Sequence, residues 1–169
     1  SEFDGRTQYS ATCDGNHYWT FLFLGTQTQV TLVNNYVHNT SGCSPKVGGN
    51  SVVHAVNNYW SNNTGFSYDV VDNGNVLLEG NYFENTAVPN KHDAETVGAI
   101  IVPSSSTQSA CKSTLGRNCV ENALSKCGSL TGNRESAALS NSKKVVSYYK
   151  PTSAKKFGST SQNFGVGSI

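Results

Sequence analysis

One segment returns three times along this chain at a fixed interval of 23 residues. An Asn-Tyr pair begins at positions 35, 58 and 81, and each pair follows an apolar run rich in valine and leucine. A fixed period in the low twenties is typical of a solenoid, in which each repeat forms one coil that stacks on the next. The three copies span residues 30–37, 53–60 and 76–83.

The period predicts an all-β fold, a right-handed parallel β-helix. Three short strands and three turns use about 23 residues, and coils stack at the interstrand spacing of roughly 4.8 Å. Stacking places Asn35, Asn58 and Asn81 above one another, where their amides can bond along the stack and to the turn backbone. The tyrosines that follow them are expected to stack in the same way. A β-sandwich is the alternative fold, but it gives no reason for a strict period.

The period also divides the chain. Residues 4–106 are interpreted as the coils, and an apolar run at 97–102 falls near the next expected repeat without its Asn-Tyr pair. Residues 107–169 lose the period and are interpreted as an irregular C-terminal strap over the side or end of the solenoid. A short helix is expected at 120–126. Residues 1–3 are interpreted as a cloning scar.

The charge pattern argues against several classes of partner. Only 14 % of the residues are charged and the formal net charge is +1, which favours neither nucleic acid nor an anionic membrane as a partner. No apolar run is long enough to span a bilayer. The carboxylates are scattered and no metal-type cysteine spacing occurs, so we expect no metal and no cofactor.

The cysteines and two asparagines favour a secreted protein. Cys111 and Cys119 close a short loop and are expected to form a local disulfide. Because the chain has five cysteines, at least one thiol is left over. Asn39 and Asn62 match the acceptor pattern for N-glycosylation. Together these features predict an extracellular location.

Several motifs in order resemble the fungal-type pectin lyases. They lie at residues 9–19, 38–47 and 54–60, and the resemblance covers most of residues 9–125. It implies the C-terminal half of such an enzyme and a right-handed parallel β-helix, in agreement with the period. Members of that family are secreted and cleave methyl-esterified polygalacturonan, the main chain of pectin, by β-elimination without calcium.

The chain departs from the family pattern in two ways. Cys43 stands immediately before Ser-Pro-Lys, where the family carries the arginine proposed to remove the C5 proton. A thiol is shorter and carries no positive charge, so elimination is expected to be lost or weak. Cys43 is alternatively redox-sensitive or disulfide-bonded, with Cys13 or Cys127. The family's N-terminal half is also missing, and with it the partner that the resemblance implies for Cys13.

A truncated solenoid presents unpaired strand edges, which invite pairing with another chain. We therefore predict either a dimer through the open N-terminal end, or a cover formed by residues 4–18 or by the strap.

The resemblance also suggests substrate-binding residues. Trp19 and Tyr18 match an aromatic cleft wall on which sugar rings stack, although packing at a coil edge would also explain them. Lys46 is expected either to contact a uronate carboxyl group or to be a solvated lysine. His17 and His54 are interpreted as structural histidines, and Trp60 as a stacking residue.

Two functions follow. One is a pectin lyase-like protein with lost or weak catalysis. The other is a non-catalytic pectin-binding or decoy protein that a host protein recognises. Pectin is the expected partner in both.

Overall fold

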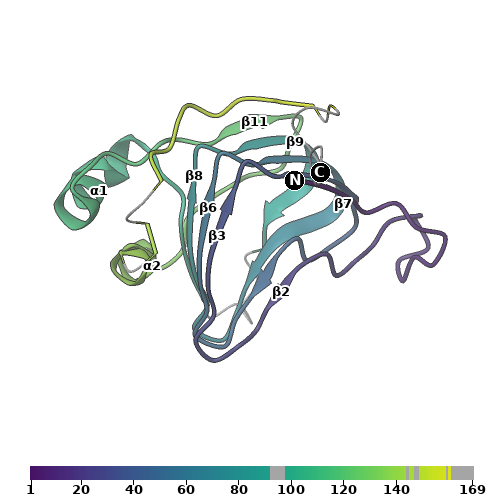
Figure 1. Cartoon of the computed structure of the whole chain (residues 1–169), viewed down its shortest axis with the longest axis horizontal. Helices are drawn as coiled ribbons and strands as arrows, with labels where there is room; N and C mark the ends of the chain where they lie inside the picture. The colour runs from purple at the N-terminus through teal and green to yellow at the C-terminus, as the bar shows by residue number, and fades with distance from the viewer. Residues whose placement is uncertain (92–97, 144, 147–148, 159, 161–169) are drawn as a thin grey trace, which may run out of the picture.

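The chain winds into stacked coils, and every pairing between its named strands is parallel (Figure 1). The computed structural model describes residues 1–91, 98–143, 145–146, 149–158 and 160. The strands are β1 (Glu2–Asp4), β2 (Leu22–Phe23), β3 (Gln29–Val33), β4 (Tyr36–Thr40), β5 (Lys46–Val47), β6 (Val52–Val56), β7 (Tyr59–Val70), β8 (Asn75–Glu79), β9 (Tyr82–Asn90), β10 (Ala99–Ile101) and β11 (Ala123–Ser125). The helices are the 3-10 helix η1 (Ser105–Thr107), α1 (Gln108–Leu115) and α2 (Glu135–Ser142).

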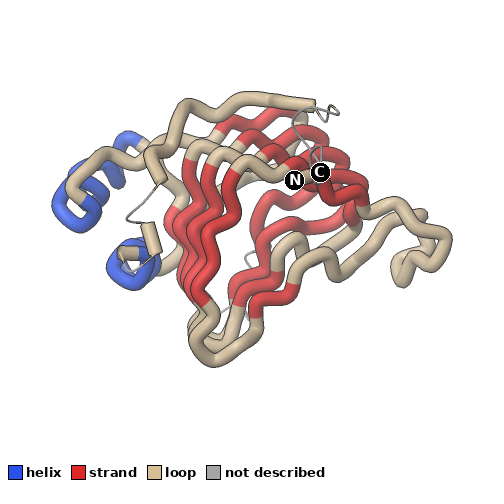
Figure 2. Tube along the Cα trace, in the orientation of Figure 1, coloured by secondary structure: helices blue, strands red, loops and turns tan. Residues whose placement is uncertain are grey.

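The register between coils follows the sequence period. In one sheet, ordered β10-β8-β6-β3, Val30 pairs with Val53 and Val53 pairs with Val76. The other sheet has seven strands and contains β7, which bends between Asn63 and Phe66 and so contributes to two sides of its coil. Figure 2 shows the strands of successive coils lying one behind the other. The prediction of a parallel β-helix with 23-residue coils is confirmed.

An asparagine ladder joins the coils along one corner. The Asn35 amide donates to the Asn58 carbonyl oxygen at 3.0 Å, and the Asn58 amide donates to that of Asn81 at 3.0 Å. Each side-chain oxygen also accepts from the backbone N–H of the asparagine in the coil before. The ladder therefore satisfies polar groups that the stacking of coils has removed from water.

The residue before each ladder asparagine makes the turn. Asn34 and Asn57 have φ values of 54° and 52°, and Gly80 has 64° in the third coil. These are left-handed conformations, which asparagine and glycine adopt at the lowest cost. The two consecutive asparagines thus have different roles, the first in the turn and the second in the ladder.

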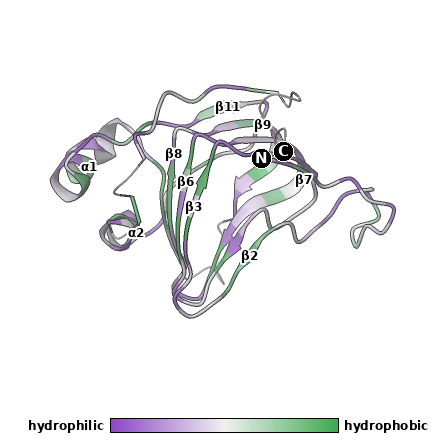
Figure 3. Cartoon of the chain, viewed as in Figure 1, coloured by the Kyte–Doolittle hydropathy of each residue, from purple (hydrophilic) through white to green (hydrophobic). Residues whose placement is uncertain are grey.

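Aromatic rings stack inside and outside the same strands. Inside, the Trp60 ring lies parallel to Phe83 with centroids 5.2 Å apart and an interplanar angle of 13°. Outside, Tyr36 and Tyr59 stack at 4.7 Å, whereas Tyr59 meets Tyr82 edge-on. Neighbouring residues of a strand point to opposite faces of the sheet. The tyrosine of each repeat therefore joins the outer stack, and the apolar residue after it joins the inner one. Figure 3 shows that the strands carry both hydrophobic and hydrophilic residues.

The period returns late in the chain, where we expected it to be lost. β11 pairs with β9, and Asn122 accepts from the Asn81 amide at 3.0 Å as the next member of the ladder. The prediction of a helix at 120–126 is therefore wrong. Helix α1 and its connections are inserted between the apolar strand β10 and this asparagine, so the spacing from Asn81 grows to 41 residues.

Helix α2 packs on the outer face of the β10-β8-β6-β3 sheet, and α1 lies beside α2 (Figure 1). A second hydrophobic cluster lies there, separate from the core inside the coils. It includes Leu77 and Ile101 from the sheet and Leu139 from α2. The predicted disulfide between Cys111 and Cys119 is present within this cluster, with an S–S distance of 2.04 Å.

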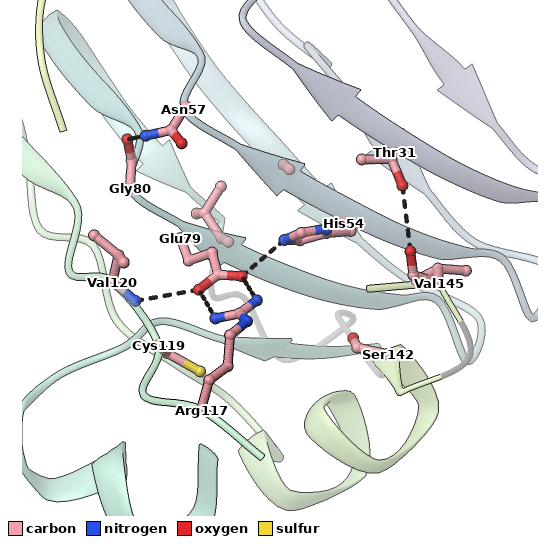
Figure 4. A network of polar contacts seen from close by, with 12 residues as sticks. Thr31, His54, Asn57, Glu79, Gly80, Arg117, Cys119, Val120, Ser142 and Val145 are labelled. Atoms are coloured by element: carbon pink, nitrogen blue, oxygen red, sulfur yellow. Dashed lines mark hydrogen bonds and ion pairs between the residues drawn. The ribbon is translucent and has the colours of Figure 1, made fainter. Parts of the chain in front are cut away.

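A buried ion pair attaches the disulfide loop to the sheet (Figure 4). Arg117 donates to both carboxylate oxygens of Glu79, at 2.6 and 2.9 Å, and the Val120 N–H donates to one of them. His54 lies 2.8 Å from Glu79 on the neighbouring strand, and both side chains are fully buried. His54 is thus the structural histidine that the sequence predicts.

The N-terminal residues cover part of the first edge. β1 pairs with β4, and the Gly5 and His17 backbones continue this contact toward Thr40 and Ser41. β2 and β3 end their sheets, and Leu22 is 50 % exposed. Dimerisation through this edge stays a prediction. Among the described residues, no helix is both long and apolar enough to cross a bilayer.

Candidate functional site

Side chains from three consecutive coils meet around Cys43. Cys43 lies in the connection between β4 and β5, and Lys46 begins β5. Tyr18 and Trp19 come from the segment before β2, whose Thr20 N–H donates to the Cys43 carbonyl oxygen at 3.0 Å. Parallel pairing of β5 with β7 adds residues of the next coil. We call this group the Cys43 cluster: Tyr18, Trp19, Cys43, Lys46, Phe66 and Asp69.

The Cys43 thiol is buried beside a carboxylate. Cys43 is 1 % exposed, and its Sγ lies 4.0 Å from Oδ2 of Asp69. Burial raises the pKa of the thiol, and the negative charge of Asp69 raises it further. Since an ordinary cysteine already titrates near 8.5, this thiol is protonated and neutral at neutral pH.

Lys46 is held by a cross-strand ion pair. Its Nζ lies 3.0 Å from Oδ2 of Asp69, its register partner on β7. The hydrogen bond to Asp69 raises the pKa of the lysine, which keeps it charged. The lysine side chain is 32 % exposed and that of Asp69 only 4 %, so the ammonium is the end of the pair that reaches solvent.

Three aromatic rings meet beside these charges. Tyr18 meets both Trp19 and Phe66 edge-on, at centroid distances of 5.0 and 5.7 Å. Trp19 is 60 % exposed, whereas a Cβ added to Gly42 would stand 2.5 Å from the Tyr18 ring. Tyr18 is therefore packed on the Cys43 segment, and Trp19 presents its ring to solvent.

Comparisons with known proteins identify the family. A family model described as pectate lyase matches residues 24–166. The chain belongs to the pectate lyase family. It is 45 % identical to a "Probable pectin lyase F" of Aspergillus niger over 170 residues, which is 100 % of this chain and 35 % of that protein. A protein of the same name from Aspergillus flavus is 44 % identical, with 100 % of this chain and 39 % of the relative covered.

A third relative of this pectate lyase family chain is the "Probable pectin lyase F" of Emericella nidulans. It is 49 % identical over 124 residues, or 73 % of this chain and 26 % of that protein. The chain spans about a third of the length of these curated relatives, which is less than the half implied by the sequence resemblance.

Hydrogen bonds of Asp14 hold the segment that leads to Tyr18 and Trp19 against the coils. This carboxylate accepts from the Thr64 hydroxyl of β7 at 2.6 Å and from the Thr12 hydroxyl at 2.8 Å. The hydrogen bond from Thr64 holds the pKa of Asp14 well below its usual range. Thr12 also bonds to Ser41 at 2.8 Å, so the segment is fixed to two coils on its way to Tyr18.

The three cysteines outside the disulfide do not pair with one another. All five cysteines are in the described part of the chain, and Cys13, Cys43 and Cys127 are free. The alternative in which Cys43 forms a disulfide with Cys13 or Cys127 is therefore wrong for this structure. Cys13 is exposed and has a left-handed backbone with φ of 58°.

Sequence reasoning missed Phe66 and Asp69 as members of the site. Both carried a usable signal, because Phe66 lies 23 residues after Cys43 and Asp69 lies 23 residues after Lys46. In a family with stacked coils, that offset places a residue directly over its counterpart. A further charged residue, Lys91, lies beside the cluster, with its Nζ 5.3 Å from the Phe66 ring centroid.

Other features of this pectate lyase family chain lie outside the cluster. A polar cavity of about 520 Å³ at the turn after β2 and its equivalents contains Gln27, Asn50 and Asn73 in its wall. Within the described part of the chain, no group of three or more histidine, cysteine or acidic side chains is arranged to hold a metal ion.

Proposed function

We propose that this chain is part of a pectin lyase-like protein that binds methyl-esterified polygalacturonan at the Cys43 cluster and has lost elimination there. The names of its relatives support pectin as the ligand. The exposed ring of Trp19 can stack on a sugar ring, and the partly exposed Lys46 ammonium can bind a uronate carboxyl oxygen. Both belong to one short stretch of the coil surface.

The buried thiol of Cys43 is the observation that carries the loss of catalysis. β-Elimination needs a base for the C5 proton and a positive charge or donor for the developing enolate. The thiol is protonated, and ionising it would place a negative charge beside Asp69. Position 43 therefore supplies neither group, whereas the resemblance implies that an arginine there supplies the base.

Restoring the arginine is expected to restore elimination. We expect the unmodified chain to release unsaturated uronides from highly methylated pectin no faster than the background without protein. We expect Cys43→Arg to exceed that background rate by about 100-fold or more, the usual contribution of a general base. Ultraviolet absorbance of the unsaturated product measures both. Activity in the unmodified chain would refute the loss of catalysis. Cys43→Ala is the control for the loss of the thiol itself.

Binding is expected to survive in the unmodified chain and to depend on Trp19. We expect Trp19→Ala to weaken binding of methyl-esterified galacturonan oligomers about tenfold, as truncation of an aromatic contact residue costs over 1 kcal/mol. Isothermal titration calorimetry checks this. Tyr9→Ala is the matched control, since Tyr9 is 81 % exposed on the same segment but lies outside the cluster. Equal affinity of all three proteins would contradict the assignment of Trp19.

The same thiol supports a second candidate, a non-catalytic pectin-binding or decoy protein recognised by a host protein. Oligomer binding together with silence of both the unmodified chain and Cys43→Arg would favour it.

Secretion and glycosylation belong to this proposal too. The Cys111–Cys119 disulfide supports an extracellular location, where such bonds persist. Of the two acceptor asparagines, Asn62 is exposed, whereas the Asn39 amide donates to Asp4 at 3.0 Å. Asn62 is thus the more accessible glycosylation site.

A further inference from the structure

Asp69 is a buried carboxylate that is only half satisfied. Its side chain is 4 % exposed, and Oδ2 is occupied by Lys46. Oδ1 is buried and has no hydrogen-bond partner among the residues that the structure describes. Since buried polar atoms are almost always paired, such an oxygen at a binding surface needs a physical explanation.

The surroundings of Asp69 contain the candidate partners. Lys46 faces it from β5 and Cys43 from the connection before β5. Burial raises the pKa of Tyr18 and the charge of Asp69 also helps to raise it, whereas Lys91 acts in the opposite direction. At position 43 a neutral side chain faces the carboxylate, with its Sγ 4.0 Å from Oδ2. A longer, cationic side chain at that position would extend beyond the sulfur, and Oδ1 is the carboxylate oxygen that lacks a partner.

We propose that Asp69 is a positioning residue of the Cys43 cluster: Oδ2 holds the Lys46 ammonium toward the ligand, and Oδ1 is placed to accept from a cationic side chain at position 43. A guanidinium has the fork of donors that matches a carboxylate, and such pairs are strong and directional. That Asp69 orients Lys46 toward a uronate rests on the proposed function. Its contacts with Lys46 and with a cationic side chain at position 43 do not.

The register of the strands explains why Asp69 can contact both Lys46 and the side chain at position 43. Asp69 stands one coil above Lys46, and the Asp69 N–H donates to the Pro45 carbonyl oxygen at 3.1 Å between these two positions. The carboxylate is thereby fixed by the sheet and not by a mobile loop. A rigid acceptor loses little conformational entropy when it orders the side chain of a neighbour.

The first test follows the Lys46 amine without any ligand. Lysines are labelled by reductive methylation with ¹³C-formaldehyde and titrated by NMR, and the Lys46 signal is identified by its absence in Lys46→Arg. We expect the pKa of Lys46 to fall in Asp69→Asn, to stay raised in Asp69→Glu and to be unchanged in the control Asp72→Asn, an exposed carboxylate nearby. An unchanged titration in Asp69→Asn would overturn the contact with Lys46.

The second test is a double-mutant cycle between positions 43 and 69, read as thermal midpoints. We expect Cys43→Arg to lower the midpoint more in the Asp69→Asn protein than in the unmodified one, by at least about 3 °C for a chain of this length. With Asp72→Asn in place of Asp69→Asn, the effects should add. Additive effects at 43 and 69 would overturn the second contact. Neither readout uses pectin, so failure of pectin binding and failure of this inference are separate results.

Discussion

Replacing Glu79 by alanine is expected to lower the free energy of unfolding by about 4 kcal/mol, since it removes the buried acceptor of the partly buried Arg117 guanidinium, the Val120 N–H and His54 at once. Glu79 is fully buried and receives three hydrogen-bond donors from Arg117 and the Val120 backbone, beside His54. In a chain of this length the loss corresponds to a fall in the melting temperature of about 8 to 16 °C, measurable by differential scanning calorimetry.

Glu84→Ala is the matched control for this substitution. Glu84 carries an ion pair with Lys156 at the surface, where such pairs contribute little. We expect its melting temperature to fall by much less than that of Glu79→Ala, although the Tyr59 hydroxyl also loses its acceptor. A Glu79→Ala protein that melts like the Glu84→Ala protein would show that the network in Figure 4 does not hold the disulfide loop to the sheet.

The same network predicts an acid dependence with a definite sign. Burial alone would raise the pKa of Glu79, but the hydrogen bonds from His54 and Arg117 outweigh it and lower the pKa below the ordinary value. The unfolded chain therefore binds this proton first, so the stabilisation is complete above about pH 4.3 and is lost as the pH falls through the folded value. Glu79→Gln should show a shallower loss of stability over this acid range.

Replacing Asn58 by alanine is expected to cost about 3 kcal/mol, because it leaves buried backbone groups without partners. Asn58 is fully buried; its oxygen accepts from the Asn35 N–H at 2.9 Å, and its amide donates to the Leu32 carbonyl at 2.9 Å. The side-chain contacts to Asn35 and Asn81 would be lost as well. Urea unfolding followed by circular dichroism measures the difference.

Asn35→Ala is the control at the end of the ladder. Asn35 is only partly buried, and its side-chain oxygen accepts from the exposed amino group of Ser1. Water can replace that contact, so we expect a much smaller loss of stability than for Asn58→Ala. Equal losses in the two variants would mean that the buried hydrogen bonds of Asn58 stabilise the coils no more than the partly exposed end of the ladder does.

The fold was predictable because a solenoid repeats its local interactions. Asn35, Asn58 and Asn81 revealed the coil length, and the stack they predict is the ladder observed. Asn122 was missed because α1 and its connections interrupt the period. The expected helix at 120–126 is instead the strand β11, which pairing with β9 imposes on a short segment of ambiguous propensity.

The site was predictable only in part. Tyr18, Trp19, Cys43 and Lys46 are brought together, as the resemblance implies. Their assignment to substrate binding stays a prediction. The burial of Cys43 could not be seen in the sequence, since it depends on the Tyr18 segment and on Asp69 from the next coil.

The period, the coil length and the presence of a thiol at the position where the resemblance implies an arginine can all be read from the amino-acid sequence. These follow from local repeats and from residue identity, which need no knowledge of packing. Only the tertiary structure decided that Asp69 lies against Cys43 and Lys46, and that Glu79 meets Arg117 across 38 residues of chain. Contacts between coils and with the C-terminal segment depend on register and on inserted elements, and their energies come from burial, which a linear pattern does not specify.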